Sequence, residues 1–193
     1  MMDRWFSSEK QLHYLYPPSI RALAARHWTP LEISKMVVDF LAPENNSRIL
    51  DIGSGAGKFC LAAAYFKPLA EFFGVEQRKH LVVHAETAKA VLGMKNVHFL
   101  HQNITQVDFT QFDHFYFFNS FYENLENTEK IDDSVMCSPH LYNYYNRCLY
   151  KKLVTVAPGT RLATFHSAGK MIPAEFHLVE EHAAGLLKYW VKE

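Results

Sequence analysis

The sequence predicts an α/β protein built on a doubly wound, mostly parallel sheet. From residue 30 onward, segments with the apolar spacing of helices alternate with short apolar segments typical of strands. A glycine-rich turn at residues 53–57 joins one of these strands directly to the helix that follows it. The aromatic run at residues 114–118 is continuous rather than alternating, which is typical of a central strand buried on both faces.

The first part of this pattern begins with a helix. We expect Thr29 to cap it, Pro30 to lie in its first turn and Glu32 to complete a capping box. Its apolar face is formed by Ile33, Met36, Val37, Phe40 and Leu41. Strands are then expected at residues 48–52, 71–76, 97–101, 114–118 and 160–166, and helices at residues 59–66 and 78–92.

The second part of the pattern contains a longer connection. Residues 120–137 are polar and are expected to form a loop or partial lid, followed by a helix from Ser138 to about Val154. Residues 176–182 and 186–191 are expected to form a closing hairpin, which brings the sheet to seven strands. Because no break in composition follows residue 30, we expect a single domain at residues 30–193, preceded by an aromatic-rich N-terminal extension at residues 1–29.

Composition and charge exclude several classes of protein. The 193 residues carry 20 Lys and Arg against 20 Asp and Glu, so broad nucleic-acid binding is not expected, although a local basic patch is compatible with this balance. The three cysteines are far apart, no apolar run approaches the roughly 20 residues of a membrane span, and residues 1–6 lack the apolar core that is typical of a signal peptide. We therefore expect a cytoplasmic protein without a membrane partner. The 11 histidines lack metal-ligand spacing, and no metal is expected.

The glycine turn indicates a ligand site. Gly53, Gly55 and Gly57 alternate between a strand and a helix N-terminus, where free backbone N–H groups can cradle a ligand. Dinucleotide sites space their glycines as Gly-x-Gly-x-x-Gly, whereas the spacing here is Gly-x-Gly-x-Gly. Asp51 precedes the turn, and its charge would repel a pyrophosphate but attract a cation.

Together with a second acid, this pattern resembles the class I, Rossmann-like S-adenosylmethionine-dependent methyltransferases. Their first motif is an apolar strand followed by Asp-x-Gly-x-Gly-x-Gly, and a later strand ends in an acid, as residues 72–76 end in Glu76. The resemblance covers residues 30–193 and implies S-adenosyl-L-methionine as cofactor. It also implies a three-layer, seven-stranded sheet whose C-terminal strand is antiparallel.

The resemblance assigns the cofactor site to residues at or just past the carboxyl ends of strands. These residues are Asp51, Gly53, Ser54, Gly55, Gly57, Glu76, Gln77, Asn103 and Ile104. Asp51 and the glycine turn correspond to the methionine half, Glu76 to the ribose hydroxyls, and Asn103 with Ile104 to adenine. The family commonly has Asp where Asn103 stands, so an Asn that only closes a turn is an alternative at this position.

The acceptor side is expected to follow the fourth strand. Asn119 stands where family members that methylate nitrogen often have Asn or Asp followed by an aromatic residue. The resemblance makes Asn119 the candidate catalytic residue and Phe121 and Tyr122 the candidate substrate-binding residues; the alternative for Asn119 is a turn cap. Glu123 is a further candidate, either as a base or as a ligand for a cationic substrate.

We therefore predict an enzyme that transfers a methyl group from S-adenosylmethionine to an unidentified acceptor, possibly at nitrogen. In the absence of a strong nucleic-acid signal, a protein or small-molecule acceptor is favoured. Two other classes stay open: a non-catalytic module that binds S-adenosylmethionine or S-adenosylhomocysteine, and an oxidoreductase with a nucleotide cofactor.

Overall fold

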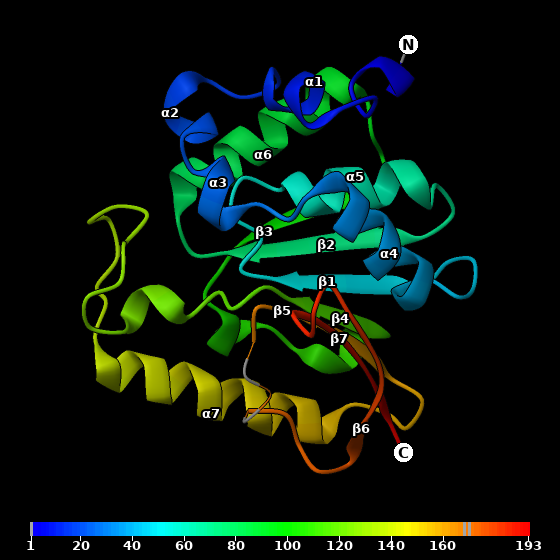
Figure 1. The fold of residues 1–193 in the computed structure, drawn as a ribbon, viewed down its shortest axis with the longest axis vertical. Helices are drawn as coiled ribbons and strands as arrows, with labels where there is room; N and C mark the ends of the chain where they lie inside the picture. The colour runs from blue at the N-terminus through cyan, green and yellow to red at the C-terminus, as the bar shows by residue number, and fades with distance from the viewer. Residues whose placement is uncertain (1, 168, 170) are drawn as a thin grey trace.

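The computed structural model describes residues 2–167, 169 and 171–193, and these residues form a sheet between two helical layers (Figure 1). Its seven strands lie in the order β3-β2-β1-β4-β5-β7-β6. They are β1 (Arg48–Ile52), β2 (Glu71–Glu76), β3 (Val97–His101), β4 (His114–Phe117), β5 (Arg161–Phe165), β6 (Phe176–His182) and β7 (Leu187–Lys192). The first five strands are parallel, and β7 pairs antiparallel with both β5 and β6. The predicted fold class is confirmed.

The helices cover the two faces of the sheet unequally. On one side lie α4 (Leu31–Leu41), α5 (Lys58–Phe66) and α6 (Lys79–Leu92), together with the N-terminal segment (Figure 1). That segment contains η1 (Met2–Arg4), α1 (Glu9–His13), α2 (Pro18–Arg21) and α3 (Ala24–His27). The other side is covered by α7 (Pro139–Thr155) and by the short turns η2 (Ile104–Gln106) and η3 (Phe109–Gln111). A further short turn, η4 (Tyr122–Asn124), follows β4.

Strand alternation builds two separate cores. In β4, Tyr116 belongs to the core under α4 and α5, whereas Phe115 and Phe117 belong to the core under α7. All three aromatic side chains are buried. The continuous aromatic run of this strand therefore follows from burial on both faces of the sheet.

The N-terminal segment is packed into the first of these cores. Phe6, Leu12, Tyr16 and Trp28 are all buried there. The Tyr16 hydroxyl also donates a hydrogen bond of 3.1 Å to the backbone carbonyl of Ala56, within the glycine turn. The segment thus supports the turn directly.

The start of α4 differs from the sequence prediction. The helix begins at Leu31 after Pro30, with no side-chain cap, so the expected capping box at Thr29 is wrong. Thr29 is buried, and its hydroxyl is 2.8 Å from that of Tyr116 in β4. A buried tyrosine hydroxyl needs a hydrogen-bond partner, which explains why Thr29 does not cap the helix. The backbone N–H of Leu31 donates instead to the Glu9 carboxylate, far upstream in the chain.

Candidate functional site

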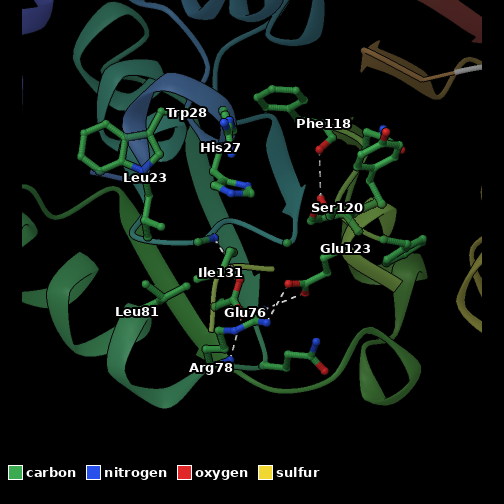
Figure 2. A pocket seen from close by; sticks show the side chains of 18 of the residues that line it. Leu23, His27, Trp28, Glu76, Arg78, Leu81, Phe118, Ser120, Glu123 and Ile131 are labelled. Atoms are coloured by element: carbon green, nitrogen blue, oxygen red, sulfur yellow. Dashed lines mark hydrogen bonds and ion pairs between the residues drawn. The ribbon is translucent and has the colours of Figure 1, made fainter. Parts of the chain in front are cut away.

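A cavity of about 870 Å³ opens at the carboxyl ends of β1, β2 and β4. Most of its lining comes from three parts of the chain: residues 23–30 of the N-terminal segment, the glycine turn with the end of β2, and residues 118–131 after β4 (Figure 2). The other lining residues include Gln102, Asn103, Ile104, Tyr145, Phe165 and His166. This position, outside the strand ends of an open α/β sheet, is where such folds bind ligands.

The glycines of the turn serve two different purposes. Gly55 and Gly57 both have positive φ, of 55° and 79°, a region that L side chains rarely adopt. An added Cβ at Gly57 would overlap the ring of Phe99 and lie 2.8 Å from the Ala85 side chain, so Gly57 allows the turn to pack on the sheet. An added Cβ at Gly55 would meet nothing within 4 Å, and Gly55 lines the cavity. Gly55 therefore leaves the turn open toward a ligand.

Glu76 lies at the end of β2 and lines the same cavity. Its carboxylate accepts one hydrogen bond from the Gly55 N–H (3.1 Å) and one from the Arg78 N–H (2.8 Å). Burial raises the pKa of Glu76 above its usual range, against the opposing effect of these bonds and of the Arg78 charge. Because a carboxylate has about four acceptor positions, it retains capacity for a diol.

Asp51 is buried beneath the turn and is not among the residues that line the cavity. It is 4% exposed, and its Oδ2 accepts a hydrogen bond of 3.5 Å from the Cys60 thiol. Burial raises the pKa of Asp51 to about 7. Ser54 also stays outside the cavity, since its hydroxyl lies against Gly74 in β2. Gly53 lines the cavity, whereas Gly57 does not.

The two residues predicted for adenine, Asn103 and Ile104, both line the cavity. Gln77, predicted for the cofactor site, lines it as well. The Asn103 side-chain oxygen accepts from the Thr105 N–H (3.1 Å), and its amide nitrogen donates to the Gln77 side chain and to the Tyr145 hydroxyl, both at 3.0 Å. Asn103 therefore caps η2, and its oxygen keeps one further acceptor position for a ligand.

The predicted acceptor residues line the opposite wall. Asn119 has a φ of 40°, and its backbone carbonyl accepts a hydrogen bond of 3.0 Å from the Tyr122 N–H. Phe121 is buried against Phe117 and Tyr145, whereas the Tyr122 side chain is 52% exposed at the cavity. Of the two aromatic residues, Tyr122 is thus the one available to a substrate.

A buried ion pair joins the two sides, and the sequence did not indicate it. The Arg78 guanidinium donates two hydrogen bonds to the Glu123 carboxylate, at 2.8 and 2.7 Å, and a third to Asp132 at 3.1 Å (Figure 2). Both Arg78 and Glu123 are buried. Glu123 is consequently occupied and does not stand free as a base. The sequence offered one indication that Arg78 lies at the site: it follows Glu76, a predicted cofactor residue, by two positions.

The N-terminal segment closes the cavity on its third side. Leu23, His27 and Trp28 line the cavity on this side (Figure 2). An ion pair between Arg26 and Glu129 links α3 to the segment after β4.

Residues 43–149, more than half of the chain, match the family model of a methyltransferase domain. The chain belongs to this family. Membership confirms the predicted methyltransferase family, and the strand order agrees with the class I, Rossmann-like fold that the resemblance implied.

Individual relatives match shorter parts of the chain. A tRNA (guanine-N(7)-)-methyltransferase of Synechococcus sp. (strain JA-3-3Ab) is 51% identical over 55 residues, which are 28% of this chain and 23% of that protein. The 23S rRNA (uracil(1939)-C(5))-methyltransferase RlmD of Shewanella sediminis is 38% identical over 71 residues, or 37% of this chain and 16% of that protein. The chain thus spans less than a quarter of the length of either relative. The crystal structure of TrmN from Thermus thermophilus shares the fold, with a TM-score of 0.59 and 17% identity over 90% of this chain and 52% of that one.

These relatives contradict one prediction. A protein or small-molecule acceptor was favoured because the sequence lacks a strong nucleic-acid signal, but the relatives with named functions are tRNA and rRNA methyltransferases. The physical reason is that a net charge of zero averages over the whole surface, whereas contact with phosphates needs only a local patch.

Among the described residues there is neither a membrane-spanning helix nor a cluster of metal-ligating side chains. Within residues 2–167, 169 and 171–193, no helix combines the length and hydrophobicity of a membrane span. The same residues contain no group of three or more His, Cys, Asp or Glu side chains placed to hold a metal ion.

Proposed function

We propose that this protein transfers a methyl group from S-adenosylmethionine to a base nitrogen of an RNA. The observation that carries the proposal is a single cavity in which the glycine turn and Glu76 face Asn119 and the exposed ring of Tyr122. Family membership supports the cofactor, and the tRNA and rRNA methyltransferases among the relatives support the acceptor.

The cofactor half of the cavity fits the group. Gly55 provides an open cradle that a side chain would fill, and Glu76 keeps acceptor positions for the two ribose hydroxyls. Gln77, Asn103 and Ile104 would surround the adenine. Asp51 is assigned to the methionine half through its charge, which acts on a cation from behind the turn. When bound, the cofactor supplies a methyl group activated by a sulfonium.

The acceptor half would position a base. The Asn119 side-chain oxygen would accept a hydrogen bond from an N–H of the acceptor nitrogen and orient the lone pair of that nitrogen into the cavity. The proton that the nitrogen loses on methylation would pass to solvent. Tyr122 would stack on a base that has left its helix or strand, as aromatic side chains do in RNA recognition. Methyl transfer is an in-line displacement that depends on positioning and exclusion of water, so no free base is required at Glu123.

The test is transfer of labelled methyl from S-adenosylmethionine to unfractionated tRNA and to rRNA. We expect label in RNA, a loss of turnover in Asn119→Ala and weaker RNA saturation in Tyr122→Ala, with S-adenosylhomocysteine affinity retained in both. Tyr14→Ala is the matched control, because Tyr14 is an exposed tyrosine outside the cavity. If no RNA of either kind became labelled, the proposal would be overturned.

A cytoplasmic location and the division of the chain at residue 30 stay predictions.

A further inference from the structure

The helix α7 concentrates positive charge in a protein whose charges otherwise balance. Its sequence, Pro139 to Thr155, contains Arg147, Lys151 and Lys152 and no acidic residue, although the whole chain has 20 acids and 20 bases. Figure 1 shows α7 on the side of the sheet opposite to the N-terminal segment. An acid-free basic helix is therefore presented on a face that the N-terminal segment does not cover.

Aromatic side chains alternate with these charges on the exposed face of α7. Arg147 and Lys151 are exposed and lie one turn apart. Tyr144 is 52% exposed and Tyr150 is 43% exposed, so both rings are accessible to a ligand. Exposed rings between cations are the combination that binds single-stranded nucleic acid, where bases stack and phosphates are neutralised.

A groove of about 740 Å³ runs between this face and residues 105–109. On the helix side, its wall is formed by Tyr144, Arg147, Lys151 and Lys152. Lys152 is held in place because its Nζ donates to the Val107 carbonyl at 2.6 Å. One acid, Asp108, also lines the groove, and its carboxylate accepts from the N–H and hydroxyl of Thr110. The three cations thus leave the groove with an excess of positive charge.

The groove adjoins the candidate active site. Tyr144 lines the groove and the next residue, Tyr145, lines the catalytic cavity. On the opposite wall, Ile104 lines the cavity and Thr105 lines the groove. A polymer bound in the groove would therefore lie beside the cavity in which its base is to be methylated.

On the basis of the RNA acceptor proposed above, we propose that the exposed face of α7 and this groove bind the phosphate backbone of that RNA. Arg147 and Lys151 contact phosphates, and Tyr144 and Tyr150 stack on unpaired bases. Such contacts position the RNA without reading its sequence. The surface therefore contributes affinity, while the choice of nucleotide is left to the cavity.

The test is the salt dependence of RNA binding by the full chain. Binding is measured from the fluorescence anisotropy of a labelled oligouridine of about 20 nucleotides. The variant is Arg147→Glu/Lys151→Glu. The matched control, Lys10→Glu/Lys95→Glu, changes the net charge equally at two exposed lysines outside the groove. Affinity for S-adenosylhomocysteine, measured in both variants, verifies that the cavity remains folded.

We expect the groove variant to bind RNA at least about tenfold more weakly and to reduce the slope of log K against log salt by about 1.4, the value for two lost phosphate contacts on a single strand. The control should change the slope much less.

Equal slopes in the two variants would show that the groove does not bind RNA. The RNA acceptor would still stand in that case, provided that the wild type methylates RNA. Absence of both RNA binding and RNA methylation in the wild type would overturn the acceptor itself. Binding of an acidic peptide in the groove, with no effect of the variant on RNA, would assign the surface to a protein partner instead.

Discussion

The two halves of the cavity are built in different ways. Most of the cofactor half comes from one continuous stretch, in which β1, the glycine turn, α5 and β2 follow one another within residues 48–76; Gln77, Asn103 and Ile104 complete it. The acceptor half is assembled from residues 23–30, residues 118–131 and Tyr145, which meet only in the folded protein. A local motif therefore defines where the cofactor binds, whereas long-range contacts define what can reach it.

Buried charge is also compensated differently at two places beside the cavity. Arg78, next to the cofactor half, and Glu123, in the acceptor half, are buried as a bidentate pair that compensates both charges. Asp51, in the cofactor half, is buried with only the Cys60 thiol as its hydrogen-bond donor among the described residues. The first arrangement stabilises the fold around the acceptor loop. The burial of Asp51 destabilises the fold, but it places a negative charge where it would attract a cationic cofactor.

Removing one partner of the buried pair should have the largest effect. Arg78→Met leaves the Glu123 carboxylate buried without its cation, which we expect to lower the free energy of unfolding by about 3–5 kcal/mol in urea denaturation. Arg78→Met/Glu123→Leu should recover most of this loss, because it removes both charges. A single variant within about 1 kcal/mol of wild type would show that the pair does not hold the acceptor loop.

The contrasting charge should appear in the pH dependence of stability. The pKa of Asp51 is about 7 in the folded protein and 3.8 as its ordinary value, so the folded state binds a proton that the unfolded state lacks between these pH values. Wild-type stability should therefore fall as pH rises from about 4 to about 7. Asp51→Asn cannot ionise, so its advantage over wild type should be absent below pH 4 and on the order of 4 kcal/mol above pH 7. If the free energies of unfolding of the wild type and Asp51→Asn, measured by denaturation at each pH, differed by the same amount across this range, the burial of an ionisable Asp51 would be contradicted.

Two glycines of one turn should separate folding from binding. Gly57→Val meets Phe99 and Ala85 at a positive φ, and we expect a loss of about 2–3 kcal/mol in the free energy of unfolding. Gly55→Ala has free space around its Cβ and should cost only about 1 kcal/mol, from its positive φ. Gly55→Ala should nevertheless weaken S-adenosylhomocysteine binding in calorimetry, because its methyl group enters the cradle. Equal losses of stability in the two variants would contradict the assignment of Gly57 to packing and of Gly55 to ligand binding.

The comparison also explains how far the sequence alone could lead. All seven strands lie within one residue of their predicted bounds, because apolar runs and glycine turns are local signals. The position of Glu76 in the cavity was predictable for the same reason. The start of α4 was not, since Thr29 is drawn to Tyr116 and the N–H of Leu31 to Glu9, both distant in sequence. Neither the pairing of Glu123 with Arg78 nor the basic groove along α7 has a local signature, because each depends on which elements pack together.

The most direct test of the central claim is calorimetric titration of S-adenosylhomocysteine into the wild type, Glu76→Ala and Glu86→Ala. Glu86 is the matched control, an exposed acid on α6 outside the cavity. If the glycine turn and Glu76 form the cofactor site, the wild type and Glu86→Ala bind alike. Glu76→Ala then binds at least about tenfold more weakly, a difference of about 1.4 kcal/mol, because the hydrogen bonds to the ribose are lost. Equal affinities in the wild type and Glu76→Ala, or no binding to the wild type, would contradict this assignment of the cavity.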